Sequence, residues 1–83
     1  MTTTEIDSKV IELSADQVGV PKEQVSRESH YINDLNYDSL DVVELSMELE
    51  DEFEVSLADD DMERVKTVGD ASDLVAEKKE KSQ

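Results

Sequence analysis

The chain has 83 residues, a length that predicts one domain with a thin hydrophobic core. Its 23 acidic and 8 basic residues give a formal net charge of -15, which disfavours binding to nucleic acid or anionic lipid headgroups and favours basic protein partners. The sequence contains no cysteine, which excludes disulfides, a thiol nucleophile and thiolate metal sites.

The first part of the chain has the periodicity of a helix. Apolar side chains recur at helical spacing from about Thr4, namely Ile6, Val10, Leu13 and Val18. Gly19, followed by Val20 and Pro21, provides a stop signal. We therefore expect a first helix that ends before Gly19.

Residues 21–38 lose this periodicity and predict a loop of roughly 18 residues. Loops of that length are usually functional or held in place by buried side chains. We expect most of its apolar residues to pack against the helices: Val25, Tyr31, Ile32 and Leu35.

A second helix is predicted from Ser39 to about Glu54, a segment without Gly or Pro. Asp38 is expected to accept hydrogen bonds from the free amides of the first turn, and Asp41 suits the positive end of the helix dipole. Both place the hydroxyl of Ser39 at an exposed helix start. An exposed hydroxyl there suits covalent modification better than catalysis.

This second helix has two apolar stripes. At about 100° per residue, the stripe expected to face the core contains Val42, Leu45, Leu49 and Phe53. The other contains Leu40, Val43 and Met47 and is flanked by the acids Asp41, Glu44, Glu48 and Asp51. The second stripe predicts an apolar docking patch with an anionic rim. Two alternatives stay open: the stripe lines the underside of the long loop, or the acids are only a solvated face.

The last third of the chain predicts one short helix and one longer helix. The short helix begins at Asp59-Asp60-Asp61 and contains Met62 and Val65. Thr67-Val68-Gly69-Asp70 has the form of a capping box, and its helix has an apolar side made by Val68, Ala71, Leu74 and Val75. We expect this last helix to fray from Lys78. The predicted fold is all-α, a four-helix bundle of three longer helices and one short helix in a single domain (1–83), ordered over about 4–78.

Catalysis by Ser39 is not supported by the sequence. The chain has one histidine, His30, expected to be a solvated loop residue, and the carboxylates near Ser39 would repel an oxyanion. We therefore expect no catalytic residues and no enzyme activity.

A calcium site is a second alternative. Asp34, Asn36 and Asp38 match the first three ligand positions of an EF-hand loop. Ser39 stands where the loop needs glycine, and Leu45 where it needs a bidentate glutamate. We expect no dedicated metal site, and a calcium-binding buffer protein stays a separate hypothesis.

Residues 34–45, with Asp38-Ser39-Leu40 at their centre, resemble the attachment motif of acyl carrier proteins. Residues 47–53 resemble the rest of that family's second helix, and residues 65–71 resemble its entry into the last helix. With the first helix and Gly19-Val20, the resemblance covers the chain from about Glu5 to Val75.

The resemblance implies that Ser39, within the motif formed with Asp38 and Leu40, carries a covalent 4′-phosphopantetheine arm. A phosphopantetheinyl transferase would donate the arm from coenzyme A. The thiol of the arm would carry acyl groups as thioesters to enzymes of fatty acid biosynthesis, and the apolar interior would shelter the acyl chain. By the same resemblance, one set of residues would meet basic patches and apolar pockets on partner enzymes: Asp38, Leu40, Asp41, Val43, Glu44, Met47 and Glu48.

Four positions depart from the family's usual pattern. Asn36 and Tyr37 replace a glycine and a small residue beside the attachment site, Ser46 replaces an apolar residue, and Ala58 replaces a proline before the third helix. Tyr37 and Ser46 keep open a specialised carrier of a polyketide, peptide or modified-lipid pathway.

The location and assembly of the protein are also expectations. The first residues lack the basic and apolar regions of a secretory signal, and no segment approaches the ~20 apolar residues of a membrane span. We expect a cytoplasmic monomer without stable membrane insertion.

Overall fold

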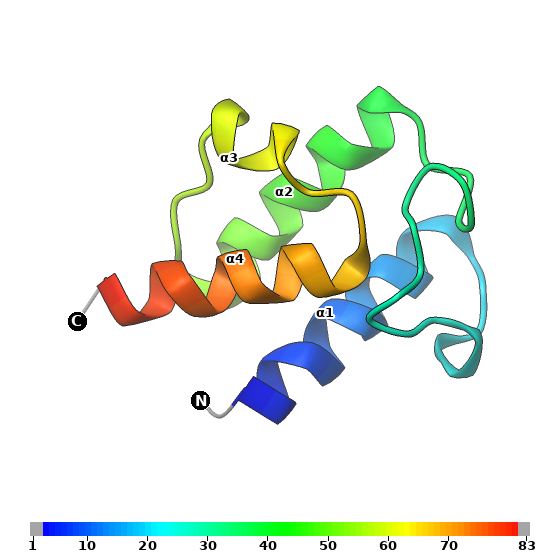
Figure 1. Ribbon diagram of the computed structural model, residues 1–83, viewed down its shortest axis with the longest axis horizontal. Coiled ribbons are helices and arrows are strands. Elements are labelled where there is room, and N and C mark those ends of the chain that lie inside the picture. The colour runs from blue at the N-terminus through cyan, green and yellow to red at the C-terminus, as the bar shows by residue number, and fades with distance from the viewer. Residues whose placement is uncertain (1–2, 82–83) are drawn as a thin grey trace.

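The computed structural model describes residues 3–81 and is helical (Figure 1). In chain order the elements are α1 (Thr3–Val18), the 3-10 helix η1 (Lys22–Gln24), α2 (Ser39–Phe53), α3 (Asp59–Glu63) and α4 (Val68–Lys81). Within these residues the extended pairing is limited to one isolated bridge, between His30 and Thr67. The predicted all-α fold, with three longer helices, one short helix and a long first loop, is confirmed.

The core lies where α1 packs against α4 and α2. Of the stripe of α2 predicted to face the core, Leu45, Leu49 and Phe53 are buried and Val42 is half-buried. The predicted apolar side of α4 is buried as well: Val68, Ala71, Leu74 and Val75. In the first helix Ile6 and Val10 are buried, whereas Leu13 and Val18 are half-buried. The periodicities of α2 and α4 therefore identify their core faces, and that of α1 does so in part.

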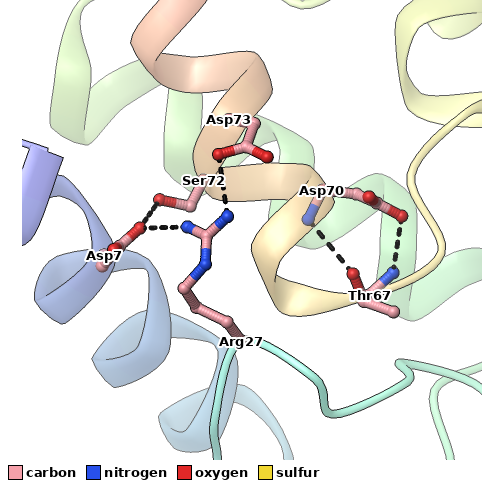
Figure 2. A network of polar contacts seen from close by, with 6 residues as sticks. All are labelled: Asp7, Arg27, Thr67, Asp70, Ser72 and Asp73. Atoms are coloured by element: carbon pink, nitrogen blue, oxygen red, sulfur yellow. Dashed lines mark hydrogen bonds and ion pairs between the residues drawn. The ribbon is translucent and has the colours of Figure 1, made fainter.

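The helix ends are formed by local hydrogen bonds. Gly19 has a left-handed φ of 72°, which glycine adopts without steric cost. Its N–H donates to the carbonyl of Asp16 at 3.3 Å, and the N–H of Val20 donates to that of Ala15 at 3.1 Å. At the start of α4, the N–H of Asp70 donates to the Thr67 hydroxyl at 3.2 Å and the Thr67 N–H donates back to the carboxylate at 3.1 Å (Figure 2). Both sequence signals act as predicted.

The long loop is held by buried side chains, as expected. Val25, Tyr31 and Leu35 are buried, whereas Ile32 is 56% exposed. Tyr37 is buried too, at 2% exposure, so its ring enters the bundle instead of standing beside Ser39 as expected. The buried aromatic ring fixes the path of the chain into α2.

Arg27 ties the loop to the two terminal helices (Figure 2). Its guanidinium donates to the Asp7 carboxylate of α1 at 2.6 Å and to the Asp73 carboxylate of α4 at 2.9 Å. Asp7 also accepts from the hydroxyl of Ser72. The N–H of Gly69 donates to the Arg27 carbonyl at 2.8 Å, and a Cβ at Gly69 would lie 3.0 Å from that oxygen, so the backbones approach closely.

α4 continues to Lys81, beyond the position from which we expect fraying, and the fraying itself stays a prediction. Two of its lysines find partners on other helices. The Lys78 ammonium pairs with the Asp61 carboxylate of α3 at 3.1 Å, and Lys79 donates to the carbonyl of Phe53, the last residue of α2, at 3.1 Å. The pairing with Lys78 is the main reason that the pKa of Asp61 is lowered.

The molecule measures 33 × 25 × 19 Å along its principal axes. Figure 1 is viewed down the shortest axis, so parts that lie far apart in the picture are far apart in the molecule. The beginning of α1 and the end of α4 lie at the lower left, and the beginning of α2 lies at the upper right. No helix in the described part of the chain is both long and apolar enough to span a membrane.

Candidate functional site

Ser39 is the first residue of α2, and its position is fixed by a reciprocal capping box. The carboxylate of Asp38 accepts from the N–H of Asp41 at 2.9 Å, and the carboxylate of Asp41 accepts from the N–H of Asp38 at 3.1 Å. The predicted capping role of Asp38 is confirmed, and the return bond from Asp41 was not predicted. Ser39 between them is exposed.

The chain enters this cap through Asn36, which has a φ of 58°. Asparagine is the side chain that most readily adopts this left-handed conformation after glycine. Asn36 therefore makes a turn for which glycine is the usual residue. Tyr37 then hydrogen-bonds through its N–H to the carbonyl of Tyr31 at 2.9 Å. The departure at Asn36 thus preserves a glycine-like turn.

Side chains of the preceding turn accept hydrogen bonds from backbone amides. The Nδ1 of His30 accepts from the N–H groups of Ile32 and Asn33, both at 3.2 Å, so this half-buried imidazole organises a turn instead of being simply solvated. The Asp34 carboxylate accepts from the N–H of His30 at 2.7 Å. Within residues 3–81, no group of three or more His, Cys, Asp or Glu side chains is placed to hold a metal ion. Asp34 and Asp38, two of the three residues that matched a calcium loop, are engaged with amides.

A groove of about 570 Å³ opens beside Ser39 between α2, α3 and the long loop. Its lining comprises Ser39, Val42, Val43 and Ser46 of α2, Asp59, Met62 and Glu63 of α3, Val65 and Lys66 that follow α3, and Ile32 of the loop. Five of these ten side chains are apolar. The groove therefore combines an exposed hydroxyl in its lining with apolar walls, an arrangement that fits an arm attached at Ser39 and an apolar cargo.

Two departures from the family pattern are accommodated locally. The hydroxyl of Ser46 donates to the carbonyl of Val43 at 2.6 Å, so the polar group that lines the groove already has a partner. The N–H of Ala58 donates to the carboxylate of Asp61 at 3.1 Å, a bond that proline cannot make. This bond holds the start of α3 in place of the proline.

The second stripe of α2 is at the surface. Leu40, Val43 and Met47 are 65%, 51% and 57% exposed, so the loop does not cover them and that alternative is wrong. The rim residues Glu44 and Glu48 are exposed as well, while Asp41 is half-buried in the cap. We call Leu40, Val43 and Met47 the apolar patch of α2. The sequence identified this patch, but it missed the α3 side of the groove, because no local pattern reports which elements face each other.

Known proteins match almost the whole chain. The family described as "Phosphopantetheine attachment site" matches residues 8–75. An acyl carrier protein of Porphyromonas gingivalis is 47% identical over 72 residues, covering 87% of this chain and 92% of the relative. That of Chlorobium phaeovibrioides is 46% identical over 78 residues, covering 94% and 100% respectively.

The fold matches as well. The solved acyl carrier protein of Enterococcus faecalis superposes with a TM-score of 0.78 at 36% identity, over 94% of this chain and 99% of that one. The expected cofactor, phosphopantetheine, is confirmed by the family. On sequence, fold and site, the chain belongs to the acyl carrier proteins, the family that carries its cargo on a phosphopantetheine arm.

Proposed function

We propose that Ser39 is the residue that carries the 4′-phosphopantetheine arm, and that the 83 residues form one acyl-carrier domain. The observation that supports this assignment most directly is the geometry of the helix start. The Asp38–Asp41 capping box fixes the backbone on both sides of Ser39, whose exposed side chain lines an apolar-walled groove. The hydroxyl is accessible to an enzyme, and the capping box holds the backbone on both sides of Ser39.

Among the described residues, the side chains around Ser39 hold the backbone of the helix start, and none of them is placed to take the proton from the Ser39 hydroxyl. The side chains that cap the helix start are carboxylates that accept from backbone amides, and the Nδ1 of the single histidine, His30, is engaged in its own turn. The base for attachment is therefore assigned to a partner, a phosphopantetheinyl transferase. As an acyl carrier protein the chain is a carrier and not an enzyme. When attached, the arm supplies a terminal thiol that holds acyl groups as thioesters.

The groove is the proposed shelter for the acyl chain. Ile32, Val42, Val43, Met62 and Val65 give it an apolar lining, and burial of an acyl chain against such walls gains about 25 cal/mol per Å² of apolar surface removed from water. Ser39 and Val43 line the groove on α2 and are exposed, so an acyl chain can also leave toward a partner enzyme.

Partner enzymes are proposed to bind the apolar patch of α2 and its anionic rim. The residues assigned to this surface are Asp38, Leu40, Asp41, Val43, Glu44, Met47 and Glu48. A basic region on the partner would be attracted by the net charge of -15, and the small apolar anchor would keep the complex short-lived. Such exchange suits a carrier that visits several enzymes.

The proposed pathway is fatty acid biosynthesis. The relatives named acyl carrier protein match over nearly their full length, which supports this assignment. One observation keeps a specialised carrier of a polyketide, peptide or modified-lipid pathway as the second candidate: Ser46 places a hydroxyl on the groove wall. The cytoplasmic location and the monomeric state remain predictions from the sequence.

Loading of Ser39 is tested by intact mass after incubation with coenzyme A and a broad-specificity phosphopantetheinyl transferase. Wild-type protein should gain one phosphopantetheine increment, and Ser39→Ala should gain none because the accepting oxygen is absent. Ser46→Ala, which removes a second hydroxyl from the same helix, is the matched control and should load fully. Circular dichroism should show that all three proteins fold. Loading of folded Ser39→Ala would place the attachment site elsewhere.

A further inference from the structure

The groove beside Ser39 has an uneven distribution of charge. Among the described residues that line it, Asp59 and Glu63 are acidic and Lys66 is the one basic residue. Asp38 and Asp41 add two more carboxylates at the helix start. An anion at Ser39 would therefore lie among negative charges, with Lys66 as the cation on the same groove.

The backbone of Lys66 is fixed from two sides. Its N–H donates to the carboxylate of Asp70 at 3.0 Å, and its carbonyl accepts from the N–H of Tyr31 at 3.0 Å. The same Asp70 carboxylate accepts from the N–H of Thr67, and these amide bonds lower its pKa. The exposed lysine side chain thus extends from a rigid point on the rim of the groove.

The ammonium of Lys66 is not committed to another group. Within residues 3–81 it makes no ion pair, although four other cations of the described chain do: Lys9, Arg27, Arg64 and Lys78. Arg64, two positions earlier, pairs with Asp61 at 3.1 Å, and Lys78 pairs with the same carboxylate. Lys66 is therefore an available cation at the rim, and the groove offers no comparable competitor.

We infer that Lys66 is a positioning residue for the arm: its ammonium pairs with the phosphodiester that joins phosphopantetheine to Ser39. The inference rests on the proposed attachment at Ser39. A phosphodiester at that oxygen is negatively charged, and Lys66 lines the groove into which Ser39 opens. Coulomb attraction then directs the first part of the arm across the groove, while the carboxylates of the cap repel it from the outer side.

The pairing of Lys66 with the phosphodiester would set the direction in which the arm leaves Ser39, and with it the position of the acyl chain. An arm held toward Lys66 starts over the groove, so its acyl chain is guided between α2 and α3. The pair is exposed to solvent and therefore weak and sensitive to salt. Basic residues of a docked partner can replace Lys66 at the phosphodiester and release the arm. Lys66 thus favours the sheltered state without trapping the cargo.

The test compares the apo and loaded forms of wild type, Lys66→Gln, Lys66→Arg and the control Lys22→Gln at low ionic strength. Lys22 lies on η1 and does not line the groove, so its variant makes the same charge change elsewhere. The melting temperature of each loaded form is compared with that of its own apo form, which cancels any effect of Lys66 on the bare fold. The phosphorus NMR shift of each loaded protein is the second measurement.

Loading should raise the melting temperature of wild type by about 2–4 °C more than that of Lys66→Gln, as expected for a weak exposed ion pair. Lys66→Arg and Lys22→Gln should behave as wild type, and the phosphorus shift should move in Lys66→Gln alone. Equal melting differences and equal phosphorus shifts in all four proteins would overturn the role of Lys66. Failure of wild type to load is visible separately by mass and would overturn the attachment at Ser39, and this inference with it.

Discussion

The hydroxyl of Tyr37 donates to the main-chain carbonyl of Ser14 at 2.6 Å, across 23 positions of the sequence. Its ring meets that of Tyr31 edge to face, with 4.9 Å between centroids, and the hydroxyl of Tyr31 lies 2.8 Å from that of Ser14. Two aromatic residues of the loop therefore converge on one serine of α1. This contact holds the chain immediately before Ser39.

Tyr37→Phe should lower the free energy of unfolding by about 1 kcal/mol, because it removes one hydrogen bond and keeps the packing of the ring. The melting temperature should fall by roughly 4–8 °C for a domain of this size. Thermal unfolding followed by circular dichroism measures the change. A melting temperature equal to that of wild type would mean that the hydroxyl contributes nothing net.

The same variant tests the behaviour at alkaline pH. Burial is the main cause that raises the pKa of Tyr31 and of Tyr37 above the ordinary value of about 10. The unfolded chain releases these phenolic protons near pH 10 and the folded chain retains them. The stabilisation is thus complete below about pH 10 and is lost as the pH rises further. Tyr37→Phe should show a shallower loss of stability above pH 10.

Residues with nearby partners could be predicted from the sequence, whereas residues with distant partners could not. Asp38 and Asp41 are three positions apart, so their capping role follows from local spacing, and the exposed Ser39 between them follows too. Tyr37 and Arg27 have partners that are 23 and 46 positions away. Local sequence patterns do not show which distant segments will pack together, so the burial of Tyr37 and the ion pairs of Arg27 were not predicted.

At the scale of elements, α2 has one face in the core and another apolar face in solvent. One stripe is buried against α1 and α4, and the apolar patch lies on the surface at the same end as Ser39. Periodicity predicted both stripes because a straight helix keeps its faces along its length. The extension of α4 to Lys81 was not predicted, since it depends on the C-terminal end of α2 and on α3 lying within reach of its lysines.

Met47→Glu should reduce kcat/KM with a partner enzyme, such as the transferase, by roughly tenfold, because a charge replaces an apolar contact worth about 1.4 kcal/mol. Met47 is 57% exposed, so the melting temperature should hardly change. Gln24→Glu, an exposed site on η1, adds the same charge outside the patch and should retain wild-type kinetics. Unchanged kinetics for Met47→Glu would show that the patch does not dock partners.

At the scale of the whole molecule, charge opposes the fold. Thirteen carboxylates and no Lys or Arg lie from Asp34 to Glu63, so the charges of this segment repel one another. The contacts of Arg64 and Lys78 with Asp61 and of Lys9 with Glu52 offset part of this repulsion. The composition alone predicted the excess, but the positions of the compensating cations depend on the fold.

Salt should therefore stabilise the protein. Raising sodium chloride from about 10 mM to about 200 mM shortens the screening length from roughly 30 Å to under 10 Å. The melting temperature should rise by roughly 4–8 °C, the equivalent of about 1 kcal/mol, and millimolar magnesium should act in the same direction. The double variant Glu48→Gln/Asp51→Asn removes two exposed charges and should show a smaller rise. A melting temperature that is insensitive to both salts would contradict this role of the acids.

The first turn of α1 and the last turn of α4 lie on the side of the molecule away from the start of α2 (Figure 1). A flexible tether attached at either end would leave the molecule from that side. The tether would then point away from Ser39 and its groove. The carrier can consequently be attached to a surface, a label or another protein by either end. The attachment would not block the approach of partner enzymes to the arm.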